Sequence, residues 1–385
     1  MSRYKVQRIV LDDTDYERSD LVTQKAAAKL LGVSVQTVSQ AMDCGRFTVI
    51  VDTEAPNPRP GGRLLLREEV TNACASDNDT LVKTVLTLTL EEEAEYVRIT
   101  AHKDGQRTRT ERINNVEFRR GSLYLYEALE SQYLSARGKR MLKTLGGLVL
   151  EPFQSLIQSS DEIVFVVPDT LLETPIDLLH HKGQPLFLQR PVSYRIAPDL
   201  GNGSALFWPA SALMISDATA DPELAVKSVA NMFDESTYVD AAEVSPLYLR
   251  QQHEFDLLLM SVHGKIDNSS GDHVILGSGA AAVTDFATIK PRIAYFDSCR
   301  LGVSGGFLDA FTGMGTKYFV APILNNEAGN SSTMTMQVFF KHLLQSKRPE
   351  VALFHTRKVL WDTYRDDRFA YRAWRGFPFR VYRLN

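Results

Sequence analysis

The chain has 385 residues, which is too long for one ordinary domain and suits two or three. Apolar residues make up 44% and charged residues 23%, as in a globular chain with a sizeable core, and the net charge of −4 provides no overall basic field for nucleic acid or an anionic membrane. The three cysteines, Cys44, Cys74 and Cys299, are far apart, which excludes a disulfide framework and fits reduced thiols in the cytoplasm. We see no targeting segment and no membrane-spanning run, so we expect a cytoplasmic protein without membrane contacts.

Residues 20–75 have the pattern of a small separate module. Its first half predicts two short helices around a turn, with Thr23 and Ser34 as N-caps and Gly32 in the turn. A hairpin-like stretch with a proline- and glycine-rich tip follows. This order resembles the helix-turn-helix of excisionase-like and MerR-like DNA-binding modules, and we expect residues 1–75 to form a small N-terminal helix-turn-helix domain.

The charge of this module leaves two kinds of partner open. Residues 1–75 carry ten Lys or Arg and ten Asp or Glu, whereas a DNA-binding surface is normally basic because phosphate contacts supply most of the affinity. The second expected helix offers only neutral polar side chains, Gln36, Thr37, Ser39 and Gln40. The module therefore binds either DNA or a protein, and its expected role is to dock an activating protein or a nucleic-acid-linked sensor.

The rest of the chain changes from a hairpin to an α/β pattern. Residues 76–120 predict a polar linker and a β-hairpin with a Lys-Asp-Gly turn. After two helical stretches, short apolar strands alternate with helices, which is typical of a mostly parallel sheet covered by helices on both faces. We therefore predict an α/β domain over residues 121–385. The expected strands are residues 163–169, 212–218, 255–264, 292–299 and 317–323, and the expected helices are residues 222–235, 304–313, 330–346 and 349–364.

Two of the expected strand ends carry reactive side chains. His263 and Gly264 come just after one buried strand, and Asp297, Ser298 and Cys299 come at the end of another. Reactive groups in α/β sheets gather at the carboxyl ends of the strands. If these two strands are parallel neighbours, His263 and Cys299 emerge side by side, and the 36 residues between them leave room for one crossover connection.

A cysteine beside a histidine can perform acyl transfer. The thiolate is the nucleophile, and the histidine accepts the thiol proton and later protonates the amine leaving group. The oxyanion needs fixed N–H donors, for which the backbone amides of Gly264 and Cys299 are the natural candidates. Glycine at 264 also lets the substrate approach closely.

These residues and their surroundings resemble the CHAT domain, a branch of the caspase-like (clan CD) cysteine peptidases. The resemblance covers roughly residues 121–385 and includes the turn VVPDTLLETP, the segment AFTGMG after the cysteine, and the ending YRAWRGFPFRVYRL. It implies a caspase-like fold with His263 as general base and acid and Cys299 as nucleophile. It also implies an oxyanion hole formed by the Gly264 and Cys299 amides, and no cofactor.

Asp297 departs from the usual CHAT pattern, which often reads S-A-C, and is closer to the D-x-C of metacaspases. The resemblance assigns this position to the pocket for the substrate residue before the cut bond, where an acid would pair with Arg or Lys. This implies cleavage after a basic residue. Alternatively, Asp297 caps the helix that follows, and both roles remain open. Arg300 either lowers the pKa of Cys299 or holds a neighbouring loop.

Two hypotheses of different classes follow. In the first, the chain is a cysteine endopeptidase of the caspase-like CHAT type that cleaves protein substrates and stays inactive until its N-terminal module or a partner signals. Bacterial relatives of this type are often parts of defence or cell-suicide systems. In the second, the chain is a DNA-binding transcriptional regulator whose CHAT-like domain is an inactive or protein-interaction module, and Cys299 is an ordinary buried cysteine. The presence of both His263 and Cys299 favours the first.

Overall fold

The computed structural model describes residues 21–23, 25–27, 49–51, 63–66, 84–104, 106–197, 209, 211–233, 235–251, 255–267, 271–346 and 348–384. The chain divides into two compact units, Met1–Val82 and Lys83–Asn385. The unit boundary therefore lies within residues 76–120, the region for which the sequence predicts a polar linker and a β-hairpin.

In the first unit, three short strands form an antiparallel sheet in the order β1 (Leu21–Thr23), β3 (Arg63–Leu66) and β2 (Val49–Val51). The antiparallel β2 and β3 coincide with the predicted hairpin-like stretch. Residues 25–27 are helical, and the Ala26 N–H donates to Thr23 Oγ1 over 3.2 Å, the contact expected of an N-cap threonine. The remainder of the predicted helix pair, with Cys44 and Cys74, lies outside the described residues.

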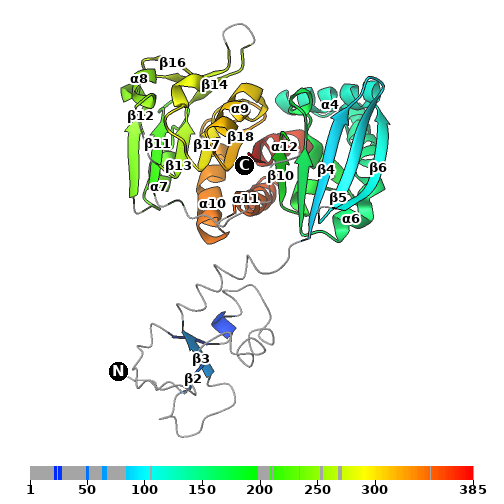
Figure 1. Ribbon diagram of the computed structural model, residues 1–385, viewed down its shortest axis with the longest axis horizontal. Coiled ribbons are helices and arrows are strands. Elements are labelled where there is room, and N and C mark those ends of the chain that lie inside the picture. Colours follow the sequence, from blue (N-terminus) through cyan, green and yellow to red (C-terminus); the bar gives the residue numbers. More distant parts are fainter. Residues whose placement is uncertain are drawn as a thin grey trace. The chain divides into compact units, whose positions relative to one another are not determined.

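The second unit is an α/β structure built on one large mixed sheet (Figure 1). Most neighbouring strands are parallel; the exceptions are the antiparallel pairs β18–β19, β4–β5 and β5–β6. The strands in sheet order are β12 (Glu235–Asp240), β11 (Ser211–Ser216), β13 (Leu257–Ser261), β17 (Ile293–Asp297), β18 (Tyr318–Pro322), β19 (Phe379–Arg383), β10 (Val192–Arg195), β7 (Glu162–Val166), β4 (Val85–Glu92), β5 (Tyr96–Lys103) and β6 (Gln106–Asn114).

The predicted hairpin region is part of this sheet. β5 and β6 form the expected hairpin around the Lys-Asp-Gly turn, and β4 pairs with β5 on one side and, in parallel, with β7 on the other. Leu86, Leu88 and Leu90 alternate along β4 and are all buried. They pack in one core cluster with side chains from the helices at residues 115–130 and 136–149. Residues 85–114 therefore belong to the same core as the later strands.

Helices cover both faces of the sheet, as the continuous apolar strands predict. Along β13, Leu257 and Leu259 pack in one core cluster with α7, α10 and α11, whereas Leu258 and Met260 pack in the other with α4, α5 and α9. None of the helices that the structure describes has the length and apolar character needed to span a bilayer. The helices are α4 (Asn115–Glu130), α5 (Ala136–Val149), α6 (Gln154–Gln158), α7 (Ala225–Ala230), α8 (Pro246–Leu249), α9 (Gly305–Gly313), α10 (Ser331–Ser346), α11 (Pro349–Thr363) and α12 (Phe369–Gly376).

Two small sheets complete the unit. β14 (His263–Lys265), β15 (His273–Leu276) and β16 (Gly279–Ala282) form an antiparallel sheet that directly follows β13, and β8 (His180–His181) pairs with β9 (Gln184–Pro185). The short β14 is the element that carries the predicted histidine.

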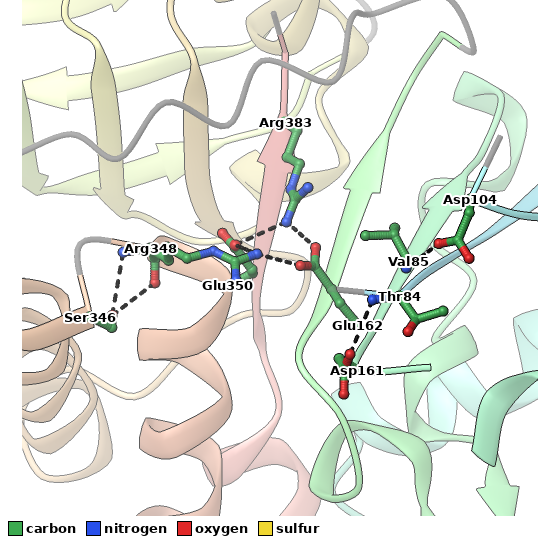
Figure 2. Close-up of polar contacts among 9 residues, drawn as sticks. All are labelled: Thr84, Val85, Asp104, Asp161, Glu162, Ser346, Arg348, Glu350 and Arg383. Atoms are coloured by element: carbon green, nitrogen blue, oxygen red, sulfur yellow. Dashed lines mark hydrogen bonds and ion pairs between the residues drawn. The ribbon is translucent and has the colours of Figure 1, made fainter. Parts of the chain in front are cut away.

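A buried ion cluster joins three of these elements (Figure 2). Glu162 begins β7, Glu350 lies in the first turn of α11, and each carboxylate pairs with both Arg348 and Arg383. Glu350 Oε1 lies 2.6 Å from the Arg348 guanidinium and 2.9 Å from that of Arg383. Because a buried charge is tolerated only when it is paired, these contacts fix β7, β19 and α11 against one another.

Candidate active site

The candidate site lies where three parallel strands end. In the sheet register, Ser216 of β11 pairs with Ser261 of β13, and Ser261 pairs with Asp297 of β17. All three residues are the last of their strands and all are buried. The histidine and cysteine strands are thus parallel neighbours, which is the condition for their ends to lie together, and the chain that follows each strand emerges at the same edge of the sheet.

Gly264 packs directly on the backbone of Cys299. A Cβ atom at position 264 would lie 3.2 Å from the Cys299 nitrogen and 2.7 Å from its carbonyl oxygen, and the second distance is shorter than real Cβ atoms adopt. The glycine is therefore required by a close approach of two backbones. This contact brings the Gly264 backbone beside Cys299. That the His263 imidazole and the Cys299 thiol act side by side stays a prediction.

Cys299 is held as a thiol. Its side chain is half-buried, and Sγ donates a hydrogen bond to Oδ1 of Asn326 over 3.5 Å. Burial raises the pKa of the Cys299 thiol, and the nearby Asp297 carboxylate adds to the rise, while the backbone amides of Asn326 and of Cys299 itself act in the opposite direction. A base must therefore remove the proton before the sulfur can act as a nucleophile.

His263 is exposed, and one of its ring nitrogens has a partner. Nε2 lies 2.8 Å from Oγ1 of Thr219, and the Thr219 hydroxyl and N–H both donate to Oδ1 of Asp217, the residue directly after β11. The sequence patterns do not identify Asp217 and Thr219 as candidate site residues. The only signal for them was a third buried strand ending in an aspartate, ALMISD, with nothing to show that it neighbours the histidine strand.

Asp297 is buried and accepts three hydrogen bonds. The hydroxyls of Ser261 and Ser332 donate to Oδ2, each over 2.7 Å, and the Asn326 amide donates to Oδ1 over 2.5 Å. All three donors are neutral groups. Burial raises the pKa of Asp297 to about 6, a rise that these hydrogen bonds oppose and the charge of Asp221 increases.

The suggestion that Asp297 caps the following helix is wrong. α9 begins at Gly305, and its N-cap is Ser304, whose Oγ accepts from the Phe307 N–H over 3.1 Å. The chain after Asp297 first makes a turn at Cys299 and a short 3-10 helix, Leu301–Val303, so the α-helix begins too far away for this carboxylate to reach.

Arg300 holds a neighbouring segment, one of the two roles predicted for it. Its guanidinium forms an ion pair with Glu173 over 2.8 Å and lies over the ring of Tyr126, 5.8 Å from the centroid. Arg300 itself has a left-handed backbone conformation with φ of 61°, which turns the chain away from the site immediately after the cysteine.

Asn326, which contacts both Asp297 and Cys299, comes from the loop after β18, and other elements hold that loop. The Asn325 N–H and side-chain amide donate to the two carboxylate oxygens of Glu130 in α4, over 2.9 and 2.7 Å. Trp374 of α12 donates to the Asn325 carbonyl over 2.6 Å. No local pattern signals this arrangement, because Glu130 and Asn325 are 195 residues apart.

Within the described residues, no cluster of three or more His, Cys, Asp or Glu side chains is arranged to hold a metal ion. No protein-family profile matches the chain, and no curated protein is recognisably similar to it in sequence. The function must therefore be argued from the site itself.

Proposed function

We propose that the chain is a caspase-like cysteine endopeptidase in which Cys299 is the nucleophile and His263 the general base and acid. The observation that carries this proposal is the close approach of Gly264, the residue after His263, to the backbone of Cys299 at the carboxyl ends of parallel strands. The resemblance to CHAT peptidases supports the same two residues. An exposed histidine and a half-buried thiol that follow neighbouring parallel strands suit acyl transfer better than a structural role.

In the proposed reaction, His263 takes the thiol proton and the Cys299 sulfur attacks the peptide carbonyl carbon. The amides of Gly264 and Cys299 donate to the oxyanion. The carbon–nitrogen bond then breaks, and the amine leaves with the proton that His263 returns. Water attacks the resulting thioester, its proton passes through His263, and the acid product leaves the regenerated thiol.

The environment of Cys299 favours an inactive state of the proposed enzyme. Burial and the nearby carboxylate raise the thiol pKa, and the sulfur donates its hydrogen bond to Asn326. Activation would then consist of releasing Sγ from Asn326 and turning it to His263. We assign the trigger to residues 1–75 or to a partner that binds them, in keeping with a bacterial defence or cell-suicide role in the cytoplasm.

Asp297 supports a preference for cutting after Arg or Lys. Its carboxylate is buried among neutral donors close to Cys299, so a substrate cation that displaces one of these donors would supply the missing counter-charge. Because the bound cation would also stabilise the ionised form, cleavage of Arg and Lys reporters should increase as the pH rises through about 6, where Asp297 ionises.

The test is cleavage of a panel of peptide reporters that differ in the residue before the cut bond, with the full-length chain alone and with lysate as a source of activator. Wild type should cut Arg and Lys reporters, and Cys299→Ala and His263→Ala should cut none. Gly313→Ala, at an exposed position at the end of α9, serves as the control and should retain the wild-type rate. Equal cleavage by wild type and Cys299→Ala would contradict the proposal.

A further inference from the structure

His263 is held by a pair of residues from the neighbouring strand end. β11 lies next to β13 in the sheet, and the turn after β11 brings Asp217 and Thr219 to the imidazole. The hydrogen bonds run in a chain from the Asp217 carboxylate through the Thr219 hydroxyl to Nε2 of His263. The proposed acyl transfer involves Cys299, His263 and the amides of Gly264 and Cys299, but neither Asp217 nor Thr219.

The directions of these hydrogen bonds follow from the chemistry of the groups. The hydrogen bond from Thr219 holds the pKa of Asp217 below its ordinary value, so this carboxylate is ionised at neutral pH and can only accept. The single hydroxyl proton of Thr219 is therefore directed to Asp217. The Thr219 oxygen is then left as an acceptor, and the ring nitrogen 2.8 Å away must be the donor.

We propose that Asp217 and Thr219 are positioning residues that hold His263 as its Nε2–H tautomer and leave Nδ1 as the nitrogen that exchanges the proton with Cys299. A neutral imidazole carries one proton, so a donor at Nε2 makes Nδ1 the acceptor. The Asp217 carboxylate also lies where it can stabilise the imidazolium that forms when the thiol loses its proton. The role of Nδ1 rests on the proposed peptidase function, whereas the tautomer does not.

The tautomer can be read directly by NMR of the full-length chain labelled with ¹⁵N-histidine, recorded at about pH 8 so that the spectrum reports the neutral imidazole. The chain has eight histidines, and His263→Gln identifies the signal of interest. We expect a proton on Nε2 and none on Nδ1 in wild type. Thr219→Val, which keeps the shape and removes the hydroxyl, should give averaged shifts for both nitrogens, and Thr219→Ser should restore the wild-type pattern.

Unchanged signals from the other histidines will show that the variants are folded, as expected because Thr219 is exposed. A wild-type spectrum with the proton on Nδ1, or shifts in Thr219→Val identical to those of wild type, overturns the inference. This spectrum decides the tautomer whether or not the chain cleaves any reporter, so a failure of the peptidase proposal is distinguishable from a failure here.

Where cleavage is measurable, the same variants test the positioning role. Thr219→Val should lower kcat about fivefold with little change in KM, the loss expected when one hydrogen bond of ordinary net strength is removed from an oriented base. Thr219→Ser should recover most of the rate. An unchanged kcat in Thr219→Val, with cleavage still dependent on Cys299, would overturn the positioning role and leave the peptidase proposal intact.

Discussion

Asp297 is a buried carboxylate whose hydrogen-bond donors are all neutral, so its ionisation lowers the free energy of unfolding. Its pKa in the folded chain is about 6 against an ordinary value of 3.8, so between these values the folded state binds more protons than the unfolded chain. The contribution of Asp297 to the free energy of unfolding therefore falls as the pH rises from about 4 to about 6, by roughly 3 kcal/mol at 1.36 kcal/mol per pKa unit.

We therefore expect Asp297→Asn to become more stable relative to wild type as the pH rises from 4 to 7. The amide is neutral throughout and can still bond the hydroxyls of Ser261 and Ser332. Chemical denaturation at several pH values measures the difference, with Asp240→Asn, at an exposed cap, as the control. Parallel stability curves for wild type and Asp297→Asn would show that the Asp297 pKa is not raised.

Gly264 is the residue at which the backbone of the histidine strand meets the cysteine. In Gly264→Ala the new methyl would lie 2.7 Å from the Cys299 carbonyl oxygen and 3.1 Å from Ser298 Cβ, so β14 must move away from the cysteine. We expect cleavage to fall about a hundredfold, as for a catalytic group displaced by about 1 Å. The free energy of unfolding should fall by about 1–3 kcal/mol, the usual cost of overpacking.

Gly313→Ala is the matched control for this substitution. Gly313 is exposed at the end of α9, and a Cβ there meets no atom within 4 Å. Kinetic assays and denaturant melts of both variants compare them with wild type. Wild-type cleavage by Gly264→Ala would mean that the contact between β14 and Cys299 does not position the histidine.

At the scale of elements, α4 and α12 determine the position of the loop that supplies Asn326. Glu130→Ala removes both acceptors that Asn325 uses, so Asn326 loses its support beside Asp297 and Cys299. We expect cleavage to fall about tenfold, while the free energy of unfolding changes by only about 1 kcal/mol, because the lost contacts are exposed hydrogen bonds.

Glu127→Ala, on an exposed position of the same helix, controls for the loss of a glutamate from α4 and should leave cleavage unchanged. Reporter cleavage and denaturant melts separate the two effects. If Glu130→Ala cleaves as wild type does, the loop keeps its position without α4.

The elements themselves were largely predictable, because their signals are local. The apolar runs at 212–218, 292–299 and 317–323 became β11, β17 and β18, and the helix predicted at 330–346 became α10 (Ser331–Ser346). The helix predicted at 222–235 is shorter, Ala225–Ala230, since the chain before it is taken up by the turns that carry Thr219 and Asp221. The parallel pairing of β4 with β7 was not predictable, because it joins segments with no shared local pattern.

Some residues of the candidate site were likewise predictable from local signals, and others were not. His263, Gly264 and Cys299 stand directly after or at the end of apolar strands, so their neighbourhood follows from the rule that parallel strands end at one edge. Asn326, Thr219 and Glu130 act from loops and from a distant helix, and their side chains reach the site only through tertiary packing. Such contacts leave no periodic pattern in the sequence.

At the scale of the whole molecule, the unit Lys83–Asn385 should fold without the first 82 residues. It has its own sheet and core, and residues 85–114 complete the sheet beside β7. A fragment of residues 83–385 should unfold cooperatively with a Tm close to that of this unit in the full chain. A fragment of residues 121–385 should not fold, because it lacks β4, β5, β6 and the first turns of α4 and exposes the face that they bury.

Circular dichroism and denaturant melts of the two fragments test this division. If residues 121–385 unfold cooperatively and are as stable as the longer fragment, then β4, β5 and β6 do not contribute to the stability of the core.

Covalent labelling of the full-length chain with a peptidyl acyloxymethyl ketone that bears arginine, followed by peptide mapping, shows whether Cys299 is the nucleophile. We expect Cys299 to be modified ahead of Cys44 and Cys74, and His263→Ala to slow this modification about a hundredfold or more, as loss of a general base does. Preferential labelling of Cys44 or Cys74, or equal labelling of Cys299 in wild type and His263→Ala, would contradict the proposed roles.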